Sequence, residues 1–222
     1  AAGFMNAGSL SDGVRQVLNA VLIASAPWGI PVTSVATLGI GWGLYAKAKG
    51  IYRDWDGEDA DIIDGAEEQL SWALLMSAVA LICDLFFFSI AVVYASGPAA
   101  MGAFIVEFFV GVGVATVLQQ KIIDLEKQIN PEKRGSVYDM KFQKKWMDSC
   151  DESEQRQIGR ACYKAYLTAT KVCLWLWVAL MVLHFALNTG LLPAVPVLHI
   201  FGVLQITYTL ESIRLGRKGE NA

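Results

Sequence analysis

Long apolar stretches separated by short polar ones dominate the pattern of this chain. Residues 70–95 form a run of 26 residues whose only formal charge is Asp84, and residues 99–120 form a run of 22 residues whose only formal charge is Glu107. Each run exceeds the ~20 residues that a helix needs to cross a hydrocarbon core. Because lipid offers no partner to backbone polar groups, the two runs and the Ser-Gly-Pro link at residues 96–98 predict a transmembrane helical hairpin.

The second half of the chain predicts two more crossings. Ser149 and Asp151 are each followed three residues later by a glutamate, which is a helix-start signal. The helix that begins there is expected to enter the membrane and run to residue 187. A second short link, residues 188–190, leads to the last crossing over residues 191–210.

The first apolar stretch, residues 14–46, contains Pro27 and Pro31. Proline removes a helical hydrogen-bond donor and disfavours helix just before it. Two arrangements are consistent with this: a short helical hairpin that turns between the prolines, or an interfacial helix over residues 11–25 followed by a crossing over residues 31–47. The second fits better, because residues 11–25 carry polar and apolar side chains as on an amphipathic helix.

The chain therefore predicts an all-α fold, a polytopic helical membrane bundle with five crossings, or six if residues 14–30 also cross. Residues 1–222 are expected to form a single membrane domain. Composition agrees, because 55% of the residues are hydrophobic and only 18% are charged. The four cysteines show no CxxC pair and no metal-ligand spacing, so neither a metal nor another cofactor is expected.

Residues 48–69 are expected to form an acidic cytoplasmic loop. Eight carboxylates are concentrated between Asp54 and Glu68. A calcium loop of the EF-hand type needs a glycine at its sixth position, and counting from Asp54 that position is Asp59. A solvated loop that leads into a helix beginning near Asp64 is therefore the preferred interpretation.

Basic residues are distributed unevenly along the chain. Of eighteen Lys and Arg, ten fall within residues 119–165, three within residues 47–53 and three after residue 213, while the two short links carry none. Under the positive-inside rule the basic segments face the cytoplasm. The pattern predicts a multi-pass protein of a cell membrane with a cytoplasmic C-terminus.

A cytoplasmic helical insertion is predicted over residues 119–165. Helical spacing of apolar residues continues as far as Asn130 and Pro131, and a further helix is expected over residues 139–148. Several side chains of this segment are more apolar and aromatic than a linker requires, so we expect them to bind a protein partner or to pack the module onto itself. They are Tyr138, Met140, Phe142, Trp146 and Met147.

Four ionisable side chains fall in the half of the membrane nearer the short links. They are Asp84, Glu107, His184 and His199. A carboxylate at such a depth costs about 2.5 kcal/mol or more to insert, so it is expected to face the bundle interior. We expect Asp84 and Glu107 to face each other on adjacent helices, with at least one protonated near neutral pH. The set predicts a proton or cation site; the alternative is two neutral acids that merely join neighbouring helices.

Two segments carry a resemblance to a known family. Residues 119–155 read QQKIIDLEKQI followed by NPEKRGSVYDMKFQKKWMDSCDESEQ, and residues 67–93 read EEQLSWALLMSAVALICDLFFFSIAVV. Over residues 48–171 the chain resembles an uncharacterised family of bacterial integral membrane proteins, domain-of-unknown-function family three-one-six-nine. Members usually carry one further N-terminal membrane helix, and no catalytic residues are assigned to them. The resemblance therefore implies an architecture and a bacterial cell membrane, but no activity.

Motifs of enzymes are absent from the sequence. It contains no HExxH, GxSxG, P-loop or GxGxxG pattern, so an enzyme is not expected. The sequence favours a regulatory or accessory membrane subunit that docks a protein partner through its cytoplasmic helices. The alternative is a small proton- or cation-coupled transporter or channel that uses Asp84 and Glu107. Membrane lipid and a cytoplasmic protein are the expected partners, with a homo-oligomer as a further option, and direct binding of nucleic acid is not expected.

Overall fold

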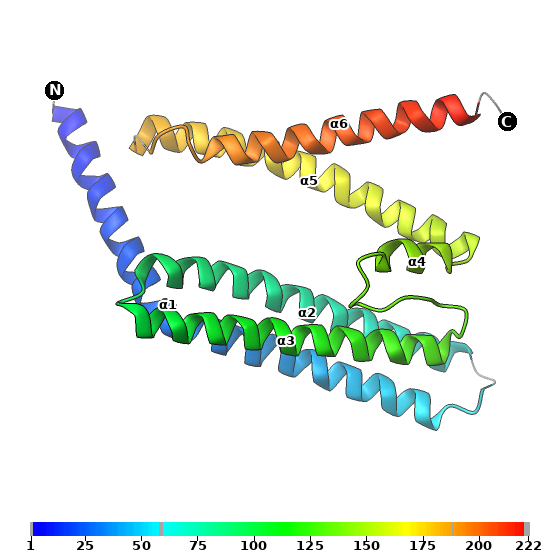
Figure 1. Cartoon of the computed structure of the whole chain (residues 1–222). Helices are drawn as coiled ribbons and strands as arrows, with labels where there is room; N and C mark the ends of the chain where they lie inside the picture. The colour runs from blue at the N-terminus through cyan, green and yellow to red at the C-terminus, as the bar shows by residue number, and fades with distance from the viewer. Residues whose placement is uncertain (1, 58–59, 188, 220–222) are drawn as a thin grey trace. The chain divides into compact units, whose positions relative to one another are not determined.

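Six helices account for most of the chain in a computed structural model that describes residues 2–57, 60–187 and 189–219. They are α1 (Ala2–Asp54), α2 (Ala60–Tyr94), α3 (Pro98–Ile129), α4 (Phe142–Asp148), α5 (Glu152–Leu187) and α6 (Ala194–Gly219) (Figure 1). No strand occurs among the described residues. Five helices are long and apolar enough to cross a membrane, with candidate spans Asp12–Asp54, Ile62–Tyr94, Pro98–Ile129, Glu152–Ala186 and Ala194–Leu215. The predicted all-α class is therefore confirmed, and the candidate spans within the described residues equal the predicted five crossings in number.

The chain divides into two compact units. One is Gln16–Cys150, and the other combines Ala1–Arg15 with Asp151–Ala222. This division differs from the single domain predicted over residues 1–222, and its boundary after Cys150 falls inside the predicted 119–165 insertion. The physical reason is that α5 and α6 pack against each other, while α1, α2 and α3 enclose a core of their own.

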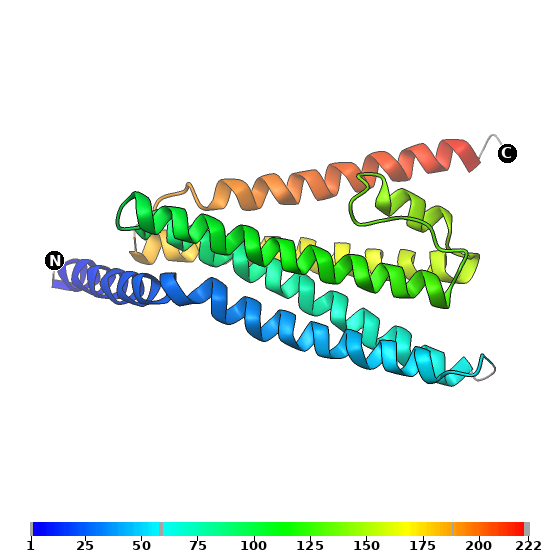
Figure 2. The same ribbon diagram turned by 60° about the horizontal axis from the view of Figure 1, so that its bottom comes forward.

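Helix α1 continues through both prolines, so the predicted hairpin does not form, and residues 11–25 and 31–47 belong to one helix rather than to two. The interfacial position of residues 11–25 stays a prediction. Figure 2 shows the ribbon of α1 as uninterrupted helix. Each proline removes a single backbone hydrogen bond, whereas a turn would expose several polar groups where a membrane offers no partner. Neighbouring hydroxyls also contact backbone carbonyls, and Thr33 Oγ1 donates to the Gly29 carbonyl at 2.6 Å. Phe87 of α2 packs directly on Gly29, where even a Cβ atom would collide with its ring.

The acidic segment is largely helical, which corrects the predicted loop over residues 48–69. Helix α1 ends at Asp54 and α2 begins at Ala60, so the link is only residues 55–59. Two of its carboxylates, Glu58 and Asp59, lie outside the described residues. Helix α2 begins at Ala60, one turn earlier than the expected start near Asp64.

The short connections follow the sequence signals closely. Gly97 has a positive φ of 101° and Pro98 occupies the first turn of α3, which ends at Asn130 as expected. At the start of α5 the Glu154 N–H donates to Asp151 Oδ1 at 2.8 Å, and the Asp151 N–H donates to Glu154 Oε2 at 2.9 Å. Of the two predicted start signals, this reciprocal capping box is the one that forms.

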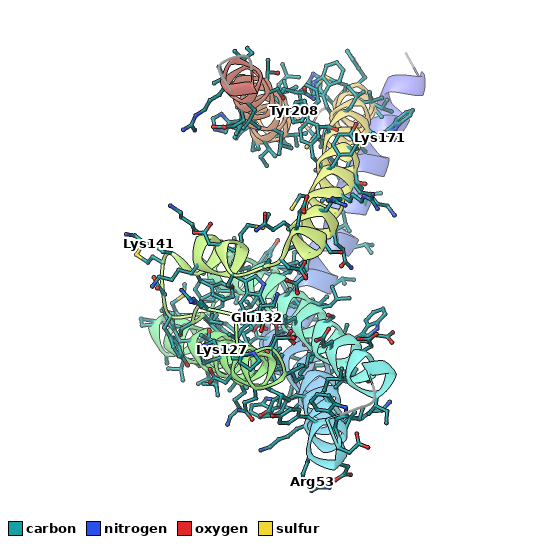
Figure 3. The ribbon with its side chains drawn as sticks, turned by 90° about the vertical axis from the view of Figure 1, so that its right-hand side faces the viewer. Arg53, Lys127, Glu132, Lys141, Lys171 and Tyr208 are labelled. Carbon is teal, nitrogen blue, oxygen red and sulfur yellow. The ribbon has the colours of Figure 1, made fainter. Side chains whose placement is uncertain are left out.

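The second link and the last helix differ slightly from the expectation. Helix α6 begins at Ala194, after Pro193, rather than at residue 191. Asn188 of the predicted link lies outside the described residues. Tyr208 of α6 lies toward α5 (Figure 3), where its ring stacks on Tyr166 with centroids 4.7 Å apart. The Tyr166 hydroxyl also donates to Gln205 Oε1 at 3.1 Å, so aromatic and polar contacts together join these two helices.

The core of the unit Gln16–Cys150 combines small side chains with leucine and isoleucine along one seam. Buried positions on α2 and α3 recur at alternating intervals of four and three residues, the spacing that keeps one helix face against its neighbour. On α2 they include Ala66, Leu70, Ala73, Ser77, Ala80 and Asp84. On α3 they include Gly111, Ala115, Leu118, Ile122 and Leu125. This spacing places Asp84 within the seam.

Helix α1 is joined to this pair along its length. Near the α2–α3 link the Tyr94 hydroxyl donates to Asn19 Oδ1 at 2.9 Å. Toward the other end the Tyr52 hydroxyl donates to the Gln128 carbonyl at 3.3 Å. The candidate site lies between these two ends.

Candidate functional site

Asp84 is a carboxyl group enclosed by helices. Its residue is 0% exposed, although it lies in the middle of an apolar helix. The Ser34 hydroxyl of α1 donates a hydrogen bond to Asp84 Oδ1 at 2.6 Å. The second oxygen, Oδ2, is buried and has no hydrogen-bond partner among the described residues. The structure confirms that Asp84 faces the interior, and it supplies Ser34 as its partner.

Three helices meet at this carboxyl group because the third presents a glycine to it. A Cβ atom at Gly111 of α3 would lie 2.5 Å from Asp84 Oδ2 and 3.2 Å from Ser34 Oγ. Real Cβ contacts are longer than the first of these distances. Glycine at this position therefore lets the α3 backbone close the pocket around the carboxyl group.

Glu107 lies one helical turn before Gly111 on α3 and lines a groove against α1. The groove has a volume of about 380 Å³, and Ser34 belongs to the same lining. Glu107 Oε2 is buried and has no hydrogen-bond partner in the described part of the chain. The structure pairs Asp84 with Ser34 rather than with Glu107. Ser34 instead connects them, because it donates to Asp84 and lines the groove together with Glu107.

The electrostatic setting of Asp84 is poor for an ionised carboxylate. A buried charge needs several hydrogen bonds or an opposite charge to offset the loss of water, and in a membrane span that cost is high. Asp84 receives one hydrogen bond, from a neutral hydroxyl. A carboxyl group in such a position becomes neutral by taking up a proton, or it takes a cation.

A second polar contact lies on the same seam, seven residues before Asp84 on α2. Gln119 Nε2 of α3 donates to Ser77 Oγ at 3.1 Å, and the Ser77 hydroxyl donates to the Leu74 carbonyl at 2.7 Å. Seven helical residues correspond to about 10 Å along the axis. The Ser77 hydroxyl therefore accepts one hydrogen bond and donates another, whereas one oxygen of Asp84 has no hydrogen-bond partner among the described residues.

The two predicted histidines belong to the other compact unit. His184 of α5 is half-buried beside Phe185, with ring centroids 5.5 Å apart, and its Nδ1 atom is buried without a partner among the described residues. His199 of α6 is exposed. The four predicted residues are therefore not assembled within one compact unit. No group of three or more His, Cys, Asp or Glu side chains within the described ranges is placed to hold a metal ion.

The predicted partner-binding residues separate into two sets. Phe142 and Trp146 of α4 are half-buried and pack on each other, with ring centroids 5.6 Å apart, and Met147 is also half-buried. Tyr138 and Met140, in the loop before α4, are exposed. Part of the set therefore packs the module onto itself, and the other part is free to contact a partner.

Helix α4 is shorter than the predicted range 139–148, and Asp139 lies in the turn that precedes it. The Lys141 N–H donates to Asp139 Oδ1 at 2.8 Å, and Lys145 Nζ forms an ion pair with the same carboxylate. This hydrogen bond from Lys145, with a smaller contribution from the backbone N–H of Lys141, lowers the pKa of Asp139. Figure 3 shows Lys141 at the outer edge of this segment.

Lys133 is buried in the loop between α3 and α4, although lysine side chains are usually exposed. It is 5% exposed, its Nζ lies 3.7 Å from Cys150 Sγ, and it lies over the Trp146 ring at 6.0 Å from the centroid. Its hydrocarbon stem and charge thus organise the loop between α3 and α4. The nearby Arg134 N–H donates to Ser149 Oγ at 3.1 Å. This hydrogen bond joins the start of the loop before α4 to the residue that follows α4.

Comparison of the chain with models of protein families, with curated proteins and with solved structures finds no match in any of the three. The resemblance to the uncharacterised bacterial family accordingly stays a prediction. The candidate site is therefore interpreted from its own geometry.

Sequence patterns found Asp84 and Glu107 but missed Ser34 and Gly111. The glycine lies four residues after Glu107, on the same helical face, and this spacing was the available signal. Ser34 offered none, because Thr33 and Thr37 carry equivalent hydroxyls nearby. Those two bond to carbonyls of their own helix, and Ser34 alone of the three donates to another helix.

Proposed function

We propose that this protein binds and releases a proton at Asp84 as part of a small proton- or cation-coupled transporter. The observation that carries the proposal is a fully buried carboxyl group with one hydroxyl donor and one oxygen without a partner among the described residues. Intramembrane carboxylates are rare and mark proton relays and ion pathways. The adjoining groove with Glu107 supplies space beside this group.

The proton is expected to control how α1 and α3 pack on α2. When Asp84 is neutral, one hydrogen bond from Ser34 and contact with Gly111 meet most of its needs. When Asp84 loses the proton, its charge requires more donors or a cation than this pocket supplies. If α3 moves away from Asp84 at Gly111, water or a cation can reach the ionised carboxylate and stabilise its charge. Proton release and a change in helix packing are therefore coupled.

We further propose the orientation that the positive-inside rule gives, in a bacterial cell membrane. The α2–α3 link and the α5–α6 link face outward, and the module around α4 and the C-terminus face the cytoplasm. Asp84 then lies in the outer half of the membrane, twelve residues before the link at residues 96–98.

The test of this function is proton movement through purified protein in liposomes. A potassium diffusion potential drives protons inward, and an enclosed dye reports the pH. We expect acidification by the native chain and loss of the signal in Asp84→Asn, which keeps the shape but cannot exchange a proton. Asp148→Asn, at an exposed carboxylate of α4, should retain it. Equal signals from native chain and Asp84→Asn, or none above empty liposomes, would contradict transport through this site.

A second function, docking of a protein partner, is favoured by one specific observation. Tyr138 is 66% exposed and Met140 is fully exposed, although both lie outside the candidate membrane spans. Beside them is a hollow of about 590 Å³ whose lining includes Phe142, Trp146 and Ile123. Exposed apolar side chains beside such a hollow are typical of a protein-binding surface, as expected for a regulatory or accessory subunit.

Photo-crosslinking in native membranes tests the docking surface. A photoreactive amino acid at Met140 should capture a discrete protein, because the side chain lies on the proposed surface. The same amino acid at Lys144, an exposed position on α4, is the matched control. Identical products from the two positions, or none from either, would contradict specific docking.

A further inference from the structure

The groove between α1 and α3 has a shape suited to a long, narrow ligand. Its α1 wall runs from Ile30 to Trp42, and its α3 wall runs from Glu107 to Val114. Twelve helical residues on α1 correspond to about 18 Å. The volume of about 380 Å³ lies in the range of small-molecule sites, which is roughly 300–1,000 Å³.

The chemistry of the groove is uneven along its length. Glu107 is the one carboxylate of the lining, and Ser34 supplies the other side-chain oxygen. The remaining wall is hydrocarbon, including Val35, Leu38 and Val110, and it reaches the indole of Trp42 at the far end. The end with Glu107 thus attracts positive charge, and the rest favours an apolar body.

We propose that this groove binds an amphiphilic monovalent organic cation, with its ammonium group at Glu107 and its apolar body along α1 and α3. The buried Oε2 atom of Glu107, which lacks a hydrogen-bond partner within the described chain, accepts the charge-assisted contact. The apolar chain or ring system of the ligand covers the hydrocarbon walls of the groove. Trp42 at the far end packs against the last part of the ligand.

Other occupants match the groove less well. An anionic amphiphile would place its charge beside a carboxylate, and a neutral one would offer Glu107 Oε2 at most an uncharged hydrogen bond. A divalent metal ion takes six or more oxygen ligands, whereas the groove offers two side chains that carry oxygen. Charge complementarity therefore selects a cation, and the hydrocarbon walls select an organic one.

This inference names the substrate class of the proposed transporter, and in that respect it rests on the proposed function. Ser34 lines the groove and donates to Asp84, so a ligand in the groove lies beside the proton site. Binding and proton movement nevertheless depend on different carboxyl groups. Their failures can be separated by measuring both.

The test is equilibrium dialysis of decylammonium, whose N–H groups can donate to Glu107 Oε2, against the full chain in phosphatidylcholine nanodiscs, with empty nanodiscs subtracted. Decyl sulfate of equal chain length is the anionic control. We expect saturable binding of the cation and none of the anion. Glu107→Gln should weaken binding about tenfold or more, because it removes one charge-assisted contact. Val110→Trp should block the groove, and Val106→Trp, one turn away and outside the lining, should not.

Each contrary outcome overturns a definite statement. Equal binding of cation and anion, or unchanged binding in Glu107→Gln, would show that the groove merely holds lipid chains and would overturn the inference. Absence of saturable cation binding together with proton flux that depends on Asp84 would overturn the inference and leave the proposed function standing. Cation binding that needs Glu107, without any flux, would support the site and contradict transport.

Discussion

The side chains of Ser34 and Asp84, 50 residues apart in the sequence, form a buried hydrogen bond of 2.6 Å between α1 and α2. This bond ties the proline-containing helix to the seam at the depth of the candidate site. Asp84 has no second donor among the described residues, so the bond from Ser34 matters more than an average hydroxyl contact.

Ser34→Ala should therefore destabilise the unit Gln16–Cys150 by about 1–3 kcal/mol, the cost of leaving a buried polar group unsatisfied. Unfolding in mixed micelles at increasing SDS fraction measures the change. The matched control is Ser89→Ala, because Ser89 is exposed and donates to the Leu85 carbonyl of its own helix. Equal small losses of unfolding free energy in both variants would show that the hydrogen bond between α1 and α2 adds no stability beyond that of a hydroxyl bonded within its own helix.

Gly111→Ala should disturb the site more than any other glycine substitution on α3. The new methyl group would lie 2.5 Å from Asp84 Oδ2, so Asp84 or the α3 backbone must move. Overpacking of this kind costs about 1–3 kcal/mol, and we also expect the proton flux to fall. Gly113→Ala on the same helix meets nothing within 4 Å and should be neutral or slightly stabilising. A neutral Gly111→Ala would mean that α3 does not close on Asp84.

Asp139 gives a pH dependence whose sign can be worked out. Its pKa is lowered, chiefly by the hydrogen bond from Lys145, so the ionised form is favoured when α4 is folded. The stabilisation of the α4 turn is present above the unfolded-state pKa of about 3.9 and is lost as pH falls through the folded-state pKa. Carboxyl ¹³C NMR should show a titration below the usual range, returning toward it in Lys145→Met. No difference between native chain and variant would argue against the ion pair.

The proposed orientation can be tested by cysteine labelling from outside intact cells. Gly97 and Gly190 have positive φ angles and Lys133 is buried, so these positions are unsuitable. Ser96→Cys and Thr189→Cys, at exposed link positions, should react with an impermeant maleimide, and Lys144→Cys should react after permeabilisation alone. The four native cysteines are first replaced by alanine. Labelling of Lys144→Cys in intact cells would reverse the orientation.

Much of the fold was predictable because long apolar runs and local end signals are properties of short segments. The hairpin at residues 96–98, the end of α3 at Asn130 and the capping box of α5 all follow from neighbouring residues. The course of α1 was not predictable in this way, because the effect of proline on a helix is known from helices considered by themselves. Contacts such as Phe87 on Gly29 keep the helix continuous, and they depend on which helices meet.

The candidate site was predictable only in part for the same reason. A lone carboxylate in an apolar run identifies Asp84 from sequence. Its partner depends on the register between α1 and α2, which placed Ser34 there and left Thr33 bonded to its own helix. The position of Lys133 over Trp146 likewise arises from the fold of the loop around it, and no pattern of neighbouring residues marks it.

The most direct test of the central claim is infrared spectroscopy of the Asp84 carboxyl group in lipid, with the Asp84→Asn spectrum subtracted. We predict a protonated-carboxyl band that belongs to Asp84, shifts in D₂O and loses intensity reversibly within about pH 5 to 9, the range in which a biological proton site must exchange. Ser34→Ala should move this band, because the hydroxyl donates to the same group. A band of Asp84 that stays constant across the whole range, or a carboxylate that remains ionised throughout it, would contradict a role in binding and releasing protons.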